Sequence, residues 1–219
     1  MSISNLEEIT CPCGNVFDAD LISAISVADN PELKEALIAG EINLVSCPQC
    51  GEMFYAECFI LYHDSENELI AFVYPLTFQN QAARCREKML KEFRSALDNF
   101  AEKQKINYEP LLIFGIEDLV LILKSEQEVE DEESVLKYTA SKIGIGALKI
   151  SPSIARKFSI PKVLPVLKGS KTIDANSITS ALKILLKHNS SLLHYAKLFD
   201  RLSKNKSMFE DVKKRLNND

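Results

Sequence analysis

The sequence predicts an α+β protein, with an N-terminal antiparallel sheet and helices followed by an all-helical C-terminal extension. Alternating apolar residues over 54–63 and 68–74 predict the two strands of a hairpin, joined by the turn residues 64–67. Apolar residues at helical spacing predict the helices. The helical segments are 79–103 and three short ones near 177–188, 191–203 and 208–216.

Turn and cap residues divide the rest of the N-terminal part. Residues 8–17 predict a strand, a tight turn and a second strand. Asn30 and Pro31 are suited to the N-cap and the first position of a helix, which Gly40 would end. Residues 42–46 are expected to form a strand that leads into the next turn.

In the middle of the chain, residues 111–114 predict a strand. The pattern of residues 116–124 fits either a helix or a strand, and a helix is favoured. The acidic run 126–133 indicates a solvated connector or a helix N-terminus, where negative charge suits the helix dipole. A further helix is expected from about residue 132 to just before Gly144.

Two cysteine turns carry the main chemical signal of the sequence. In Cys47-Pro48-Gln49-Cys50-Gly51, two residues separate the cysteines, so a tight turn can aim both sulfurs at one point. Cys11-Pro12-Cys13-Gly14 is a shortened relative, and residues two apart on an extended segment point to the same side. The sequence therefore predicts one zinc-ribbon-like zinc site with Cys11, Cys13, Cys47 and Cys50 as ligands.

Other chemistry for the same cysteines stays open. Iron binds in the same kind of four-thiolate cage. A redox dithiol at Cys47 and Cys50 is less favoured, because catalytic redox pairs usually begin a helix and these follow a strand. Four thiolates leave no open coordination position, so we expect a structural site and no enzymatic activity. A thiol redox enzyme or a metal-dependent hydrolase is the alternative.

The sequence resembles the CpXC family, which is named for two Cys-Pro-x-Cys motifs. The resemblance covers residues 8 to about 140, and the first motif departs from the family pattern because it is Cys-Pro-Cys. Membership implies zinc binding and no established activity. The matching segments are 9–14, 30–34, 40–43, 47–51, 62–64 and 113–119.

Charge is distributed unevenly along the chain. Residues 1–134 hold 9 Lys and Arg against 26 Asp and Glu, a net charge of −17, whereas residues 135–219 hold 17 against 5, a net charge of +12. We expect the basic helices to pack against the rest of the chain, or against a second copy, through apolar faces. Nucleic acid is the less favoured partner, because aromatic residues for base stacking are few in the basic half.

Three further residues are candidates for chemistry, and each has a simpler interpretation. His63 is expected to close a turn beside Asp64, Cys58 to be a buried apolar residue, and Cys85 to have no role in metal binding. Residues 153–161 resemble the first helix of a helix-turn-helix. Pro165 would break the second helix, so we do not favour that motif.

These observations predict a zinc-stabilised interaction module that binds another protein or its own copy. Its expected domains are a zinc-binding domain, 1–130, and a basic helical region, 131–219. The first residues have no basic segment followed by an apolar one, and no apolar stretch is long enough to span a bilayer, so no membrane partner is expected. Cysteines in a chain without an export signal favour a reducing cytoplasm.

Overall fold

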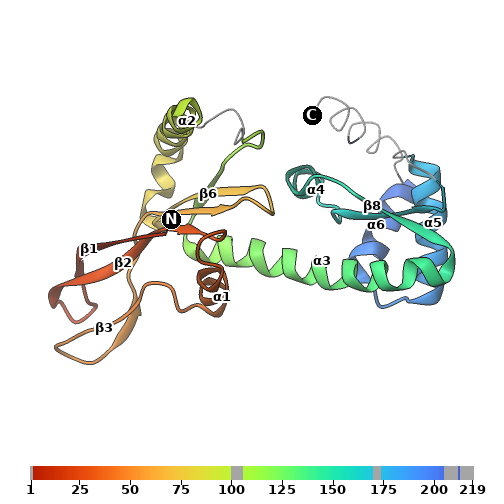
Figure 1. Ribbon diagram of the computed structural model, residues 1–219. Coiled ribbons are helices and arrows are strands. Elements are labelled where there is room, and N and C mark those ends of the chain that lie inside the picture. Colours follow the sequence, from red (N-terminus) through yellow and green to blue (C-terminus); the bar gives the residue numbers. More distant parts are fainter. Residues whose placement is uncertain (1, 100–105, 170–173, 205–211, 213–219) are drawn as a thin grey trace. The chain divides into compact units, whose positions relative to one another are not determined.

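The structure is a computed structural model that describes residues 2–99, 106–169, 174–204 and 212. It confirms the α+β class. The chain divides into two compact units, Met1–Lys124 and Ser125–Asp219, and the helix α3 (Ile116–Ile143) contains the division (Figure 1). The predicted domain boundary at residue 130 also lies within this helix. In the described ranges, no helix combines the length and the apolar character needed to cross a membrane.

The first unit is built on a five-stranded sheet with the order β1-β2-β5-β6-β7. Neighbouring strands are antiparallel, except that β2 pairs in parallel with β5 and β6 pairs in parallel with β7. The predicted strand over residues 111–114 is confirmed. The strands are β1 (Ile3–Thr10), β2 (Val16–Ser26), β5 (Ile60–Asp64), β6 (Leu69–Tyr74) and β7 (Leu111–Phe114).

Helices cover both faces of this sheet. Leu69, Ala71 and Val73 of β6 belong to one apolar cluster, which includes Leu37 of α1 (Glu32–Ala39) and residues from the start of α3. The alternate residues of β6 pack with Cys85 and Met89 of α2 (Ala82–Asn99), which follows the short helix η1 (Leu76–Gln81). Because successive side chains of a strand point to opposite faces, every residue of β6 is buried.

Two ribbons extend from this part of the first unit, one formed by β1 with β2 and the other by β3 (Leu44–Ser46) with β4 (Met53–Tyr55) (Figure 1). The prediction of a single strand over residues 54–63 is wrong, because β4 and β5 lie in different sheets. Between them, the N–H of Ala56 donates to the carbonyl of Asn43 over 2.9 Å. This bond continues the β3–β4 pairing to residue 56, so the first part of the segment stays with β3 and does not extend β5. The predicted alternation remains, since Ala56, Cys58, Ile60 and Tyr62 are all buried.

The helix α3 corrects two expectations at once. The acidic run 126–133 is neither a connector nor a helix start, and no new helix begins near residue 132, because α3 continues without a break for 28 residues. Its acidic side chains bind partners in the second unit. Glu126 pairs with Arg156 over 2.6 Å, and Glu130 pairs with Lys162. Pairing removes the mutual repulsion that would disfavour a helix at a run of like charges.

The second unit is not all-helical, contrary to the prediction. The strands β8 (Ile145–Lys149) and β9 (Val163–Leu167) form a two-stranded antiparallel sheet, and α4 (Pro152–Phe158) lies in the connection between them. In this sheet Pro165 faces Ala147. A two-stranded sheet leaves one side of each strand without a ladder, so it tolerates a residue that lacks an N–H. The strand β9 occupies the place of a second helix, which excludes the helix-turn-helix motif.

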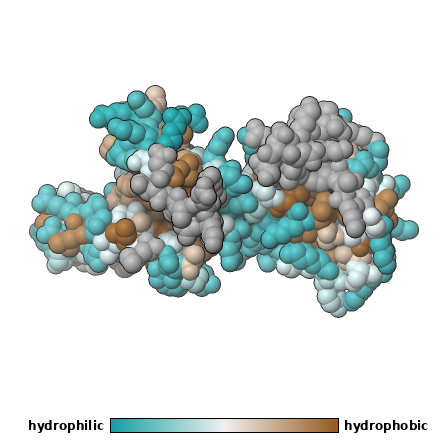
Figure 2. Space-filling view, turned by 45° about the horizontal axis from the view of Figure 1, so that its top comes forward, coloured by the Kyte–Doolittle hydropathy of each residue, from teal (hydrophilic) through white to brown (hydrophobic). Residues whose placement is uncertain are grey.

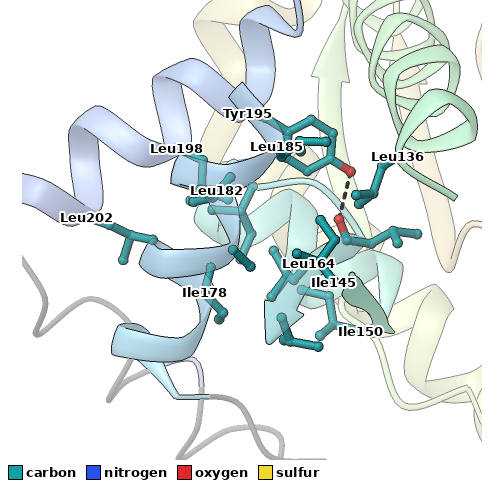
Figure 3. Packing of buried hydrophobic residues seen from close by; sticks show 14 of the residues in the cluster. Leu136, Ile145, Ile150, Leu164, Ile178, Leu182, Leu185, Tyr195, Leu198 and Leu202 are labelled. Carbon is teal, nitrogen blue, oxygen red and sulfur yellow. Dashed lines mark hydrogen bonds between the residues drawn. The ribbon is translucent and has the colours of Figure 1, made fainter. Parts of the chain in front are cut away.

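Two of the three predicted C-terminal helices are confirmed, as α5 (Ala175–His188) and α6 (Leu193–Lys204). The third, near 208–216, lies outside the described residues apart from residue 212. The fully buried ring of Tyr195 packs among apolar side chains from α3, β9, α5 and α6, and its hydroxyl donates to the carbonyl of Val163 over 2.8 Å (Figure 3). The basic C-terminal helices therefore pack through their apolar faces onto the same chain, as expected.

Glutamates of α3 also fix the backbone of the second unit. The carboxylate of Glu132 accepts hydrogen bonds from the backbone N–H groups of His194 and Tyr195, in the first turn of α6. It also lies 2.9 Å from Nδ1 of His194. These contacts satisfy N–H groups that a helix start leaves without a partner.

Candidate metal centre

The four predicted cysteines lie at the ends of the two ribbons. Cys11 and Cys13 lie in the turn between β1 and β2, and Cys47 and Cys50 in the turn between β3 and β4. In the second turn the N–H of Cys47 donates to Glu52 and the N–H of Gly51 donates to Cys47, both over 2.9 Å. The φ angle of Gly51 is +74°, a conformation that glycine adopts without steric cost.

The turns bring all four sulfur atoms together. The Sγ atoms lie within 4.8 Å of one another, with 3.7 Å between Cys11 and Cys50 and 3.8 Å between Cys13 and Cys47. Four sulfurs at about 2.3 Å from a tetrahedral zinc ion would be about 3.8 Å apart. The shortened first motif therefore still places Cys13 at a suitable distance. The cluster can hold a metal ion.

The surroundings of the cluster favour different charge states for its members. Burial raises the pKa of the Cys11 thiol to about 12. Burial also opposes ionisation of Cys47, but the N–H groups of Cys50 and Gln49 and the neighbouring thiols lower its pKa to about 6. These hydrogen bonds favour the thiolate form of Cys47. A thiolate is the form of cysteine that binds metal ions.

Neighbouring side chains that sequence reasoning missed help to hold the ribbons together. The side-chain amide of Asn15 lies 3.7 Å from Sγ of Cys47 and so links the first ribbon to a sulfur of the second. The rings of Phe17 and Phe54 meet edge to face with their centroids 6.3 Å apart. Asn15 follows the first cysteine turn directly, and this position was the signal that could have identified it.

Asn43 forms a second link at the base of the ribbons. Its side-chain oxygen accepts from the N–H of Ile22 over 2.8 Å, and its amide donates to the carbonyl of Ile22 over 3.0 Å. The amide therefore bonds β2 as a neighbouring strand would. Its backbone has a φ of +57°, a conformation that asparagine tolerates better than most residues.

The remaining cysteines lie apart from the cluster. Cys58 is buried, as predicted; Sγ lies 3.2 Å from the amide of Asn43, and burial raises the pKa of its thiol to about 11. Cys85 lies on α2, and its side chain is buried against β6. Within the described part of the chain, the four-cysteine cluster is the one group of at least three Cys, His, Asp or Glu residues arranged to hold a metal ion.

His63 and Asp64 point to different partners and do not form a catalytic pair. Nε2 of His63 lies 3.1 Å from the hydroxyl of Tyr108, and burial lowers the pKa of this histidine. Asp64 accepts hydrogen bonds from Lys34 and Asn67. The expected turn at Asp64 is present, since its side chain accepts from the backbone N–H of Asn67.

The fold and the site define a class: an α+β protein in which two ribbons hold a four-cysteine cluster at their ends. The family described as CpXC protein matches residues 9–132, more than half of the chain and including all four cysteines. The chain belongs to the CpXC family. No curated protein and no solved structure matches it.

Proposed function

We propose that the chain is a non-enzymatic, zinc-stabilised module that binds another protein. The observation that carries the proposal is the convergence of Cys11, Cys13, Cys47 and Cys50 from two separate ribbons, with Sγ atoms within 4.8 Å. Four thiolates match the ligand set of structural zinc sites and leave no coordination position for a substrate. The binding energy of such an ion stabilises the fold.

The sulfur-only ligand set supports zinc, although iron also binds four thiolates. The six cysteines are free in the structure, and free thiols persist in a reducing compartment, which supports a cytoplasmic location. The metal-binding domain of this proposal is residues 1–130. In the basic region that follows, 131–219, α5 and α6 pack against Leu136 and Ala140 of α3. A protein partner or a second copy fits this arrangement better than a membrane.

Nucleic acid is the less favoured partner of the proposal. Several cationic side chains of the second unit are engaged within it, because Arg156 and Lys162 pair with glutamates of α3. The guanidinium of Arg201 donates to the backbone carbonyls of Phe158 and Ser159. Groups held in this way are less available to phosphates. A salt titration against duplex and single-stranded oligonucleotides tests the alternative, since phosphate binding weakens steeply as salt rises.

The metal site is tested by elemental analysis of the purified chain and of cysteine variants. We expect about one zinc ion per chain, and loss of the metal in Cys47→Ser and in Cys50→Ser. Cys85→Ser is the matched control, because Cys85 is also a free cysteine but lies outside the cluster. A wild-type chain without metal, or equal metal loss from Cys85→Ser, would contradict the assignment.

A further inference from the structure

An apolar groove in the first unit has no role in the metal site. It has a volume of about 340 Å³ and lies between the end of α1 and the first turns of α3. The buried side chains of Leu37 and Ile42 line it together with Ile116 and Val120. A smaller hollow of about 90 Å³ is also lined by Ile42 and Ile116. The surface hollow is therefore apolar and preformed.

Large apolar side chains border the groove and face solvent. Leu121 is 63% exposed and Tyr55 is 53% exposed, and the hydroxyl of Tyr55 donates to the carbonyl of Gly40 over 2.7 Å, which fixes its ring. On the face shown in Figure 2, apolar residues are scattered among hydrophilic ones. Sites for small molecules bury most of their ligand's surface. An open groove with an exposed apolar rim is better suited to side chains presented by a partner protein.

Charge identifies the kind of partner. The first unit holds 9 Lys and Arg against 20 Asp and Glu, a net charge of −11. The groove itself is lined by one acidic residue, Glu117, and one basic residue, Lys124, so the negative field comes from the unit as a whole. This field attracts cationic segments and repels nucleic acid.

We propose that the groove binds a segment of another protein that carries bulky apolar side chains next to lysine or arginine. The apolar side chains fill the hollow between α1 and α3, and the cationic ones lie beside Glu117 on the acidic first unit. This inference rests on the proposed role as a protein-binding module and adds the surface and the partner's chemistry.

The test uses a defined probe, a fluorescein-labelled peptide of the heptad Leu-Lys-Lys-Leu-Leu-Lys-Leu repeated twice. Binding is followed by fluorescence anisotropy at physiological salt. We expect a Kd on the order of micromolar for the wild-type chain. Leu121→Glu should weaken binding at least about tenfold, because it places a charge on the groove's rim.

Leu6→Glu is the matched control. Leu6 is 71% exposed on β1, outside the groove, and the substitution changes the same residue type and adds the same charge. It should change the Kd less than about twofold. Equal weakening by both variants would overturn the proposal, because it would indicate general attraction to an acidic surface. Equally tight binding of the peptide with glutamate in place of lysine would also overturn it.

Two further measurements separate the other occupants. Sedimentation equilibrium showing a wild-type dimer that Leu121→Glu converts to monomers would assign the groove to a second copy and overturn the proposed partner. Zinc content is measured on the same samples. Zinc without peptide binding would refute the groove alone, whereas peptide binding without zinc would refute the metal site and leave the groove.

Discussion

Lys34 of α1 donates a hydrogen bond from Nζ to Oδ2 of Asp64, at the end of β5, over 2.9 Å. Asp64 is 2% exposed and also accepts from the backbone N–H and the side-chain amide of Asn67. The pair joins segments 30–34 and 62–64, two of the motifs that make the family resemblance specific. These motifs thus attach α1 to the sheet, which gives them a structural role.

Loss of this ion pair should destabilise the first unit. Asp64→Ala leaves Lys34 and the N–H of Asn67 without their acceptor, and we expect the free energy of unfolding to fall by about 3 kcal/mol. The free energy of unfolding is measured by urea unfolding followed by circular dichroism. Glu66→Ala changes an exposed carboxylate in the same turn and should have little effect. Equal losses from the two variants would contradict a special role for Asp64.

The same carboxylate should contribute to acid sensitivity. Burial opposes its ionisation, but hydrogen bonds from Asn67 and Lys34 hold the pKa of Asp64 below its ordinary value. Because the pKa is lower in the folded state, Asp64 stabilises the fold at pH values above its unfolded-state pKa of about 3.9. This contribution is lost as the pH falls through the folded-state pKa. Unfolding measured from pH 5 downward should show a shallower loss in Asp64→Asn than in the wild type. The same loss of stability with falling pH in Asp64→Asn and in the wild type would contradict this role of Asp64.

Metal removal should affect the two units differently. The cluster links ribbons that belong to the first unit, whereas the second unit has an apolar core of its own. After treatment with a chelator, we expect faster hydrogen exchange in β1 to β4 and unchanged exchange in α5 and α6. Mass spectrometry of peptic fragments gives this comparison directly. A uniform increase over both units would be the opposite result.

Asn43 should be the most sensitive residue at the base of the ribbons. Asn43→Ala removes both hydrogen bonds to Ile22 and places a residue with a Cβ and no amide at a φ of +57°. We expect a loss of about 2–3 kcal/mol in the free energy of unfolding. Asn43→Gly also lacks the two hydrogen bonds to Ile22, but glycine adopts a positive φ without strain. Its loss of stability should therefore be smaller than that of Asn43→Ala. The control Asn5→Ala changes an exposed side chain, and a loss as large as that of Asn43→Ala would disprove the assignment.

Glu133 should make the second unit sensitive to pH in the opposite direction. It is 1% exposed, and Oε1 accepts from the N–H groups of Lys162 and Val163. Among the residues that the structure describes, Oε2 has no hydrogen-bond partner. Burial raises its pKa, although Lys162 and the N–H groups oppose this. Because the pKa is higher in the folded state, Glu133 stabilises the fold at pH values below its unfolded-state pKa. This contribution is lost as the pH rises through the folded-state pKa.

Glu133→Gln has the same shape and does not ionise. Its stability relative to the wild type should therefore increase between pH 4 and pH 7, as measured by urea unfolding. Glu128→Gln changes an exposed glutamate of the same helix and should show no such trend. A constant difference between Glu133→Gln and the wild type across this range would refute the argument.

Local chemistry determined the features that the sequence predicted well. Gly40 ends α1 in a left-handed conformation, as expected, because a glycine after an apolar helical segment is a local stop signal. The two cysteine turns depend in the same way on residues within five positions of one another. Two such turns match the pattern of a zinc ribbon, which indicated that they share one site. Each of these features is encoded within a short window of the sequence.

Only the tertiary structure decided where long-range partners replace local preference. The acidic run 126–133 continues as helix with support from Arg156 and Lys162, about thirty positions away, which pair with two of its glutamates. Segment 54–63 divides between two sheets because β4 pairs with β3 whereas β5 pairs with β2 and β6. Pro165 enters a strand because β8 pairs with β9. Hydrogen bonds and ion pairs between distant segments outweigh helix and strand propensities, which amount to a few tenths of a kcal/mol per residue. A local sequence pattern carries no information about these distant partners.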